Sequence, residues 1–542
     1  MENSGTPRPA GSKLARIRRI SQILFLALFA FLLVNTELPR SARGAQTDIR
    51  IPYPIRLFLE IDPFTALSNA LASGALYRGL LWSLAVVVPT LLLGRVFCGW
   101  ICPLGTLNHF VSWFKSERKR GKWLIESNRY KKWQGLKYYI LVAALVAALF
   151  GSGIGGLLDP ISLAVRSFSV SILPALNYAT GGALAFKQEY FRQGAVLGAI
   201  LAVVLLLNLR ITRFWCRALC PLGALLGWLA RGSILNLKKD QTLCDGCNRC
   251  LLACQGGDDP IPGVPWRKAE CHLCFNCVGQ CPTAGLEFQW AARPVDAVRG
   301  PNLERRKLLA GVGVGLAITP MLRSSAGLAV ERDARLIRPP GSLEEKSFLG
   351  RCIRCGACMK VCPNNALHPA GVEAGIEGLW TPVLVARIGY CEPSCSLCGQ
   401  ACPTGAIWEF TAREKGWAAG IPAAGNTRPA AQPIRIGTAF YDRGRCLPWA
   451  MATECIVCEE WCPTSPKAIY LRPAEVAEAA GGAKTVRQPY VDPARCVGCG
   501  ACEYACPVQD RPAVYVTSIG ESRSKSNQIL LERNAKRGIG KA

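Results

Sequence analysis

The 28 cysteines of this 542-residue chain all fall into spaced groups, and this spacing constrains the fold more than any other feature of the sequence. Four groups share the spacing C-x2-C-x2-C-x3-C, and two more are spaced less regularly. The regular groups are Cys244, Cys247, Cys250, Cys254; Cys271, Cys274, Cys277, Cys281; Cys352, Cys355, Cys358, Cys362; and Cys496, Cys499, Cys502, Cys506. The irregular groups are Cys391, Cys395, Cys398, Cys402 and Cys446, Cys455, Cys458, Cys462.

Runs of this kind ligate [4Fe–4S] clusters, with three close thiolates on one cubane and the fourth on a partner cubane. Six groups of four therefore predict six [4Fe–4S] clusters, which indicates a role in moving electrons. A disulfide framework suits short secreted domains and does not explain the triplet spacing. Zinc sites usually pair a C-x2-C with a distant second half, and the chain has only three histidines.

The first 231 residues are rich in long apolar segments. These are Ile20–Val34, Leu80–Phe97, Tyr138–Leu158 and Gly194–Leu209. Each approaches the roughly 20 residues that a helix needs to cross a bilayer. We therefore expect residues 1–231 to form an α-helical membrane domain of four helices.

The net charge of +27 is concentrated in this apolar part, where 27 Lys/Arg stand against 9 Asp/Glu. The bases gather at the ends of the apolar segments, at Arg16–Arg19 and between Lys115 and Lys132. This is the positive-inside pattern of an inner-membrane protein, so both basic stretches are expected in the cytoplasm. The same distribution argues against a nucleic-acid partner.

Two cysteine pairs lie outside the cluster runs, and both belong to the motif C-x3-C-P-L-G. Cys98 and Cys102 follow the second apolar segment, and Cys216 and Cys220 follow the fourth. The repeat implies two similar hairpins, whose four thiols could converge near the cytoplasmic interface. One interpretation is a redox or metal site beside a quinone pocket, as a dithiol, a disulfide or an iron site. The other is simple packing of cysteines at helix ends.

The rest of the chain divides into four segments. We expect a cytoplasmic two-cluster module at 232–293, and then a linker with a signal or anchor helix at 294–330. A periplasmic four-cluster domain is expected at 331–518, and a basic disordered tail at 519–542. The pair Arg305-Arg306 before a weakly apolar stretch resembles a twin-arginine export signal. The stretch is predicted to remain as a fifth helix.

Other cofactors are not expected. No C-x-x-C-H for c-type haem occurs, and His109 is the only histidine in the first 231 residues. The glycines at 151–156 match G-x-G-x-x-G, but they close an apolar helix, so they indicate packing and not nucleotide binding.

The spacing also predicts how the runs pair. In 232–293, Cys281 should complete the cubane of the first triplet and Cys254 that of the second. For 331–518 we predict nested pairing, in which the regular outer runs share ligands and the irregular inner runs share ligands. Cys506 would then join Cys352, Cys355 and Cys358, and Cys462 would join Cys391, Cys395 and Cys398.

These features resemble two ferredoxin-type proteins of the periplasmic nitrate reductase system, joined in one chain. Residues 1–293 resemble the NapH/MauN family in their helices, both C-x3-C-P motifs, and the loops at Asp62-Pro63 and Asp159-Pro160. Residues 300–518 resemble the NapG/MauM family in the twin-arginine leader and the four clusters. The two cluster modules, 232–293 and 331–518, are expected to have a bacterial-ferredoxin-like α+β fold. Gln255, which replaces a proline after Cys254, departs from the pattern, and so does the fusion itself.

The resemblance implies a quinol dehydrogenase component that takes electrons from the quinone pool to a periplasmic reductase or cytochrome. Two alternatives remain open. One is a relay from a cytoplasmic donor without a quinone site, and the other is an electron donor for maturation or regulation of a periplasmic metalloenzyme.

Overall fold

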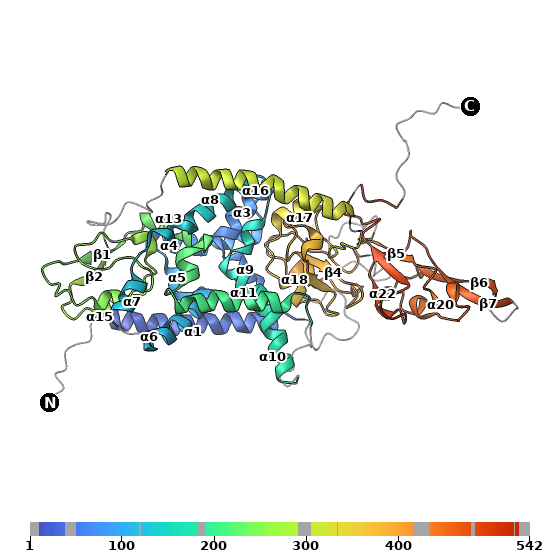
Figure 1. The fold of residues 1–542 in the computed structure, drawn as a ribbon, viewed down its shortest axis with the longest axis horizontal. Helices are drawn as coiled ribbons and strands as arrows, with labels where there is room; N and C mark the ends of the chain where they lie inside the picture. Colours follow the sequence, from blue (N-terminus) through green and yellow to red (C-terminus); the bar gives the residue numbers. More distant parts are fainter. Residues whose placement is uncertain are drawn as a thin grey trace, which may run out of the picture.

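The computed structural model describes residues 10–37, 50–118, 121–181, 190–290, 305–332, 334–415, 433–477, 483–524 and 526–529. The molecule is elongated, with helices in the middle and small units with short strands at both ends (Figure 1). We call the helices between residues 10 and 229 the helical body. The unit at 235–290 is module A, and the two units at 334–412 and 436–518 are modules B and C.

The helical body consists of two similar halves. Each half has five helices in the same order. The first is apolar, the second starts at an Asp-Pro pair, the third is apolar, the fourth is short and the fifth starts at a proline. The first half contains α1 (Ala10–Asn35), α3 (Pro63–Ser73), α4 (Leu84–Leu92), α5 (Val96–Trp100) and α6 (Pro103–Arg118). The second contains α8 (Leu136–Leu149), α9 (Pro160–Ser167), α11 (Gly194–Leu206), α12 (Phe214–Ala218) and α13 (Pro221–Leu229). The repeat predicted from the cysteine motifs thus extends through the helices.

The Asp-Pro pairs explain where two of these helices begin. The Asp62 carboxylate accepts a hydrogen bond from Phe64 N at 2.9 Å, and the Asp159 carboxylate accepts one from Ser162 N at 2.7 Å. Each aspartate caps its helix, and the proline that follows suits the first helical position, where no N–H is needed. Smaller helices complete the body: α2 (Arg56–Glu60), α7 (Lys122–Asn128) and α10 (Leu173–Ala179).

The apolar helices differ in length. Helix α1 has 26 residues, while α4, α8 and α11 have 9, 14 and 13. The second expected helix, Leu80–Phe97, is not continuous. It begins with a 3-10 turn at Arg78–Ser83, continues as α4 and is interrupted at Gly94, where φ is 116°, before α5 begins. Within the described residues, one helix, Lys13–Asn35, is long and apolar enough to cross a membrane, and Arg78–Leu92 and Gly194–Leu209 are shorter apolar stretches.

Module A has the layout expected for paired cluster runs. Strand β1 (Leu235–Lys239) pairs antiparallel with β2 (Leu286–Trp290), so the chain leaves the module beside the point where it entered. Between them, α14 (Arg249–Ala253) and α15 (Asn276–Gln280) each carry the third cysteine of a run and contact each other. Leu235, Trp266 and Leu286 form part of its small core.

Helix α16 (Arg305–Arg332) lies between module A and module B in the chain. Its 28 residues extend for about 42 Å, along one side of the helical body (Figure 1). It packs on α8, where a Cβ on Gly315 would lie 2.9 Å from Val146 Cβ and 3.0 Å from Ala143 O. Glycine therefore permits this close approach. The linker at 294–304 lies outside the described residues.

As in module A, each run of modules B and C carries its third cysteine on a short helix. Module B contains α17 (Glu345–Arg351), α18 (Ala357–Lys360), β3 (Leu367–Pro369), β4 (Pro382–Leu384) and α19 (Leu397–Gln400). Module C contains β5 (Thr438–Tyr441), α20 (Leu447–Ala450), α21 (Val457–Glu460), β6 (Ile469–Ala477), β7 (Ala483–Val491), α22 (Ala501–Ala505) and β8 (Val514–Thr517). The sheets pair β3 with β4, β5 with β8, and β6 with β7, all antiparallel.

Two segments differ from expectation. The stretch 473–488, whose Pro and Gly residues suggest a surface loop, lies mostly in the β6–β7 hairpin, whose pairing runs from Ile469↔Val491 to Ala477↔Ala483. The polar segment after Ser518, expected to start a disordered tail, returns to the domain. There Arg523 donates to Glu345 at 2.7 Å, because the half-buried carboxylate needs cationic partners. Residues 530–542 lie outside the described chain.

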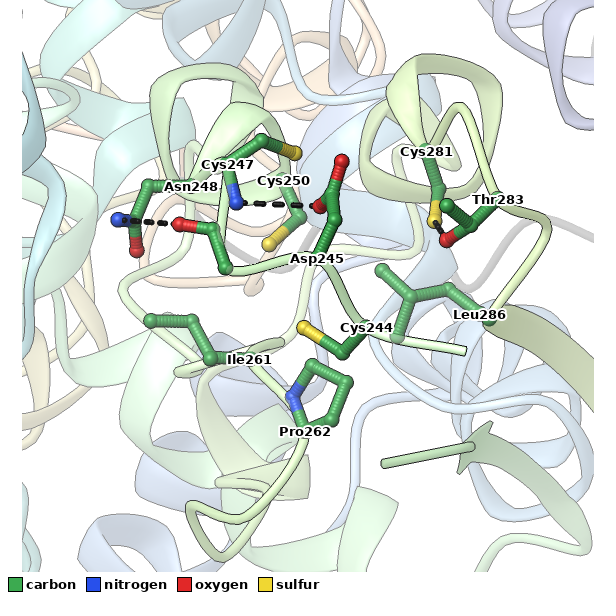
Figure 2. Close-up of a pocket in the computed structure, with 12 residues that line it drawn as sticks. Cys244, Asp245, Cys247, Asn248, Cys250, Ile261, Pro262, Cys281, Thr283 and Leu286 are labelled. Carbon is green, nitrogen blue, oxygen red and sulfur yellow. Dashed lines mark hydrogen bonds between the residues drawn. The ribbon is translucent and has the colours of Figure 1, made fainter. Parts of the chain in front are cut away.

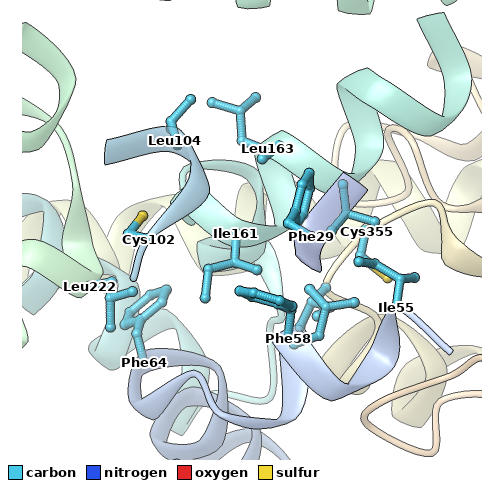
Figure 3. Packing of buried hydrophobic residues seen from close by; sticks show 14 of the residues in the cluster. Phe29, Ile55, Phe58, Phe64, Cys102, Leu104, Ile161, Leu163, Leu222 and Cys355 are labelled. Atoms are coloured by element: carbon cyan, nitrogen blue, oxygen red, sulfur yellow. The ribbon is translucent and has the colours of Figure 1, made fainter. Parts of the chain in front are cut away.

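The helical body and module B share one continuous core. Cys102 and Cys355 lie at its two sides, with Phe64, Ile161 and Phe58 between them (Figure 3). The glycine-rich loop after α8 forms part of this junction. A Cβ on Gly156 would lie 2.6 Å from Ile353 O, and Gly153 N donates to Leu349 O at 3.2 Å. These glycines pack against module B, as their position at the end of an apolar helix suggested.

Candidate redox site

The first thiol group lies at the outer end of module A. Cys244, Cys247, Cys250 and Cys281 line one small cavity, with Ile261, Pro262 and Leu286 around them (Figure 2). The first three belong to one run and the fourth closes the next. This arrangement matches the crossed ligation predicted from the spacing. Cys247 is exposed and Cys244 half-buried, so this group faces the surface.

The second thiol group lies deeper, toward the helical body. Cys254 is within electrostatic range of Cys274, and Cys271 is within range of Cys274 and Cys277. Cys254 thus faces the triplet of the other run, which completes the crossed pattern. All four of these cysteines are buried.

In modules B and C the nested pairing predicted from the spacing is wrong. Cys402 lies within electrostatic range of Cys352, Cys355 and Cys358, and Cys362 lies in range of Cys395 and Cys398. The first run therefore pairs with the second.

The third run pairs with the fourth in the same way. Cys462, Cys496, Cys499 and Cys502 line one cavity, and Cys506 lies near Cys446 and Cys458. Runs that are neighbours in the chain also place their helices in contact, α18 on α19 and α21 on α22. The prediction failed because it relied on regularity of spacing. The connections between sequential runs fold back as antiparallel strand pairs, β3 with β4 and β6 with β7, and this brings sequential runs together instead.

A paired set of cysteine variants tests this assignment. We expect Cys462→Ser to remove about four irons per chain, and Cys462→Ser with Cys499→Ser to remove no more, because both thiols serve one group. Cys462→Ser with Cys398→Ser should remove about eight. Iron and acid-labile sulfide quantitation gives the result. If the pair with Cys398 were the non-additive one, the nested arrangement would hold.

The thiol groups of modules B and C form a sequence in space. Cys391 N donates to Cys499 O at 2.8 Å, so the Cys391 group of module B adjoins the Cys496 group of module C. On the other side, Arg354, between Cys352 and Cys355, donates to Gly153 O of the helical body. The order from the helical body outward is therefore the Cys352, Cys391, Cys496 and Cys446 groups.

The spacing i,i+4 would suit two cysteines on one face of a single helix. The structure instead places the two cysteines of each C-x3-C motif in different elements. Cys98 and Cys216 lie on the short helices α5 and α12, and Cys102 and Cys220 precede α6 and α13. Pro103 and Pro221 are the first residues of α6 and α13. Proline favours this position because it has no N–H to leave unpaired. The four sulfurs are nevertheless within electrostatic range of one another.

A cavity of about 450 Å³ lies between the helical body and module B. Its lining comprises Arg56, Glu60, Ala75, Leu76, Tyr77, Arg78, Gly79 and Arg351. Tyr77 packs against Gly405 and lies within electrostatic range of Cys402, so the cavity adjoins the first thiol group of module B. No sequence motif predicts these cavity residues. Arg56 and Glu60 stand at i,i+4, a spacing that allows an ion pair, and their Nε and Oε1 atoms are 3.4 Å apart.

The residues present fit iron–sulfur clusters. None of the 28 cysteines forms a disulfide. In the part of the chain that the structure describes, no three ligating side chains meet around a single ion. In the groups of Cys244 and Cys496 the four thiols line one cavity, which suits a polynuclear cluster with cysteine ligands. Crossed groups within small paired modules define an iron–sulfur electron-transfer protein of the ferredoxin type.

Comparison with known families agrees with this class. A model described as a 4Fe-4S binding domain matches residues 75–122 and again 193–239, the two segments that carry the C-x3-C motifs. A model described as a 4Fe-4S dicluster domain matches residues 351–406 and 451–509. Each dicluster match covers two neighbouring runs or most of them, as the pairing in modules B and C requires.

The chain belongs to the family of MauM, a methylamine utilization ferredoxin-type protein. It is 34% identical to MauM of Methylorubrum extorquens over 219 residues, which are 40% of this chain and 87% of the relative. The ferredoxin-type protein NapG of Escherichia coli is 29% identical over 219 residues, 40% of this chain and 82% of NapG. YccM of Escherichia coli, named a putative electron transport protein, is 27% identical over 280 residues, 49% of this chain and 73% of YccM. No solved structure is significantly similar to the chain.

Proposed function

We propose that this chain is a quinol dehydrogenase component of the inner membrane that passes electrons from membrane quinol to a periplasmic redox partner. The observation that carries the proposal is the 450 Å³ cavity at the junction of the helical body and module B. Its volume suits a small organic ligand. It lies beside exposed apolar helix on one side and the Cys352 thiol group on the other.

The surface of the helical body supports a membrane setting. Large apolar side chains are exposed on all four apolar helices, for example Ile23 on α1, Val88 on α4, Leu149 on α8 and Val203 on α11. Exposed apolar surface on each of these helices is expensive in water and favourable in lipid. Leu81 and Trp82, next to the cavity lining, are also exposed, which would let quinol enter from the bilayer.

The cavity holds the groups that quinol oxidation needs. Oxidation to the quinone releases two electrons and two protons. Arg56, Arg78 and Arg351 can hold the quinol oxygens. Glu60 is 4% exposed, and burial raises the pKa of its carboxyl, while Arg56 opposes this shift. Glu60 is therefore the proposed acceptor for one proton, and the second proton would pass to solvent water.

The six thiol groups identified above would hold six [4Fe–4S] clusters, which accept and pass on one electron each. The cysteines of modules B and C form the outward sequence that begins beside the cavity. We propose that module C delivers electrons to a periplasmic reductase or cytochrome. Module A would remain in the cytoplasm, and Arg305-Arg306, at the start of α16, would direct export of modules B and C.

Replacement of the proposed proton acceptor tests this function. We expect Glu60→Gln to slow reduction of the protein by a quinol analogue roughly 100-fold, the usual scale for loss of a general base. Reduction by dithionite should be unchanged, because the thiol groups remain intact. Cluster absorbance after rapid mixing measures both rates.

A matched control is Glu126→Gln, which changes an exposed glutamate on α7, away from the cavity lining. It should reduce at the normal rate. If Glu60→Gln reacts with quinol as fast as the unaltered protein, Glu60 is not the acceptor and the cavity loses its assigned role.

The exposed thiol group of module A favours a second candidate function, a relay from a cytoplasmic donor to the periplasm. Cys247 lies on the surface at the end of the molecule remote from module C. In that case a quinol analogue would leave the clusters oxidised, while a reduced ferredoxin would reduce them.

A further inference from the structure

We propose that Cys98, Cys102, Cys216 and Cys220 hold a seventh metal centre, an iron–sulfur cluster of the [2Fe–2S] class with two thiolates from each half of the helical body. This inference does not depend on quinol oxidation. It rests on four buried sulfurs that the fold brings together, on the donors that face them, and on buried cations beside them.

Each of the four sulfurs accepts a hydrogen bond. At Cys102 and Cys220 the donors are the backbone N–H groups of Gly105 and Gly223, at 3.4 and 3.1 Å. The helices α6 and α13 begin at these cysteines, so the positive end of each helix faces a sulfur. A sulfur that receives an N–H is best suited to be a thiolate, and N–H···S bonds are a common feature around iron–sulfur clusters.

The other two sulfurs receive side-chain donors. Arg95 Nη2 lies 3.8 Å from Cys98 Sγ, and Asn108 Nδ2 lies 3.7 Å from Cys216 Sγ. Arg95 and Asn108 are both buried. Packing cysteines at helix ends would not require a polar donor for every thiol.

A buried cation without enough partners gives a second, independent indication. Arg213 is fully buried and uses Nη1 to donate to Cys98 O at 3.0 Å. Its Nε and Nη2 have no hydrogen-bond partner among the described residues. It lies within electrostatic range of Cys216, as Arg95 does. Burying such a charge is costly unless an anionic group compensates it, and a [2Fe–2S] cluster with four thiolates has a net charge of about −2.

The donor set selects the class of centre. Each half of the body supplies one pair of buried thiols. Two pairs that face each other match the two irons of a [2Fe–2S] cluster, each with two thiolates.

The site also lies against the inner thiol group of module A. Gly99, between Cys98 and Cys102, packs on His272 O, and Trp100 Nε1 donates to Leu273 O at 3.0 Å. Arg217, between Cys216 and Cys220, packs on Gly257, close to Cys254 in the chain, and is within electrostatic range of Cys254. Both C-x3-C loops therefore face the group of Cys254, Cys271, Cys274 and Cys277, which would let electrons pass between them.

The test uses the purified full-length protein, prepared anaerobically. We expect about two irons per chain beyond those of six cubanes, and, after reduction with dithionite, a slowly relaxing paramagnetic signal that persists at temperatures where cubane signals broaden. Cys98→Ser with Cys216→Ser should lose both and keep the cubane signals. Retained cubane iron would show that this variant folds.

A second pair of variants avoids removing any ligand. Asn108→Leu deletes one N–H···S bond and should lower the reduction potential of the slowly relaxing signal without loss of iron, because such bonds favour the reduced state. Asn177→Leu changes another buried asparagine of the helical body, whose amide has no hydrogen-bond partner among the described residues, and should leave the potential unchanged. Cubane iron only, with the four cysteines recovered as free thiols, as two disulfides or bound to zinc, would overturn the proposal.

Discussion

Replacement of Gly156 by leucine is expected to detach module B from the helical body. The ideal Cβ position at Gly156 lies 2.6 Å from Ile353 O, 2.8 Å from its Cα and 2.9 Å from its carbonyl carbon. All three are backbone atoms between Cys352 and Cys355, so no side chain can rotate away. Overpacking of this kind costs on the order of 1–3 kcal/mol, or roughly 5- to 150-fold in the docking equilibrium.

Hydrogen exchange of residues 349–354 measures this effect directly. Exchange should rise in Gly156→Leu, because Leu349 O and Arg354 lose their partners at Gly153. Gly313→Leu is the matched control, since a Cβ there meets no atom within 4 Å. Unchanged protection in Gly156→Leu would mean that the junction does not exist in solution. Under the proposed function, the variant should also lose quinol-driven reduction while dithionite still reduces it.

The second large effect is expected from acid at Glu345. Burial alone would raise the pKa of this carboxyl, but the nearby charges and hydrogen bonds of Arg338 and Arg523 outweigh burial and lower the pKa to about 2. Arg338 Nη2 lies 2.6 Å from Oε1 and Arg523 Nη1 lies 2.7 Å from Oε2. A depressed pKa stabilises the fold at pH values above the ordinary value of 4.5, here by about 3 kcal/mol.

That stability should disappear as the pH falls from about 4.5 to about 2, because the folded carboxylate is then protonated. Glu345→Gln should therefore destabilise the C-terminal domain at pH 7 and flatten its pH dependence below 4.5. Urea unfolding of the full chain at several pH values, followed by cluster absorbance, gives both quantities. Glu344→Gln, at the neighbouring exposed position, is the control. Parallel pH curves for Glu345→Gln and the unaltered protein would contradict this account.

The local rules of cysteine spacing predicted much of the metal chemistry. A C-x2-C-x2-C run has to wrap one cubane, so the triplets and the crossed partner Cys281 were accessible from the sequence. The doubled C-x3-C motif likewise indicated two similar halves, because a motif that long repeats only with its surroundings. These predictions succeeded where the geometry depends on residues that are close in the chain.

The remaining features depend on contacts between distant segments. Cys462 joins Cys496 through the fold of module C, and nothing in the regularity of the runs encodes that partner. The cavity around Glu60 needs Arg351 from almost 300 residues later. The β6–β7 hairpin overrides weak strand propensity because the strands pair along nine positions. In each case tertiary pairing decides what local sequence leaves open.

The closure of Glu345 by Arg523 has a consequence for biosynthesis. The two residues are 178 positions apart, so at a synthesis rate of about 5–20 residues per second the second arginine follows the carboxylate by roughly 10–40 s. During this interval Glu345 has only Arg338 to offset its charge, and module B lacks the ion pair between Glu345 and Arg523. Closure by Arg523 would follow as the last step, so the same ion pair that stabilises the finished domain also times its completion.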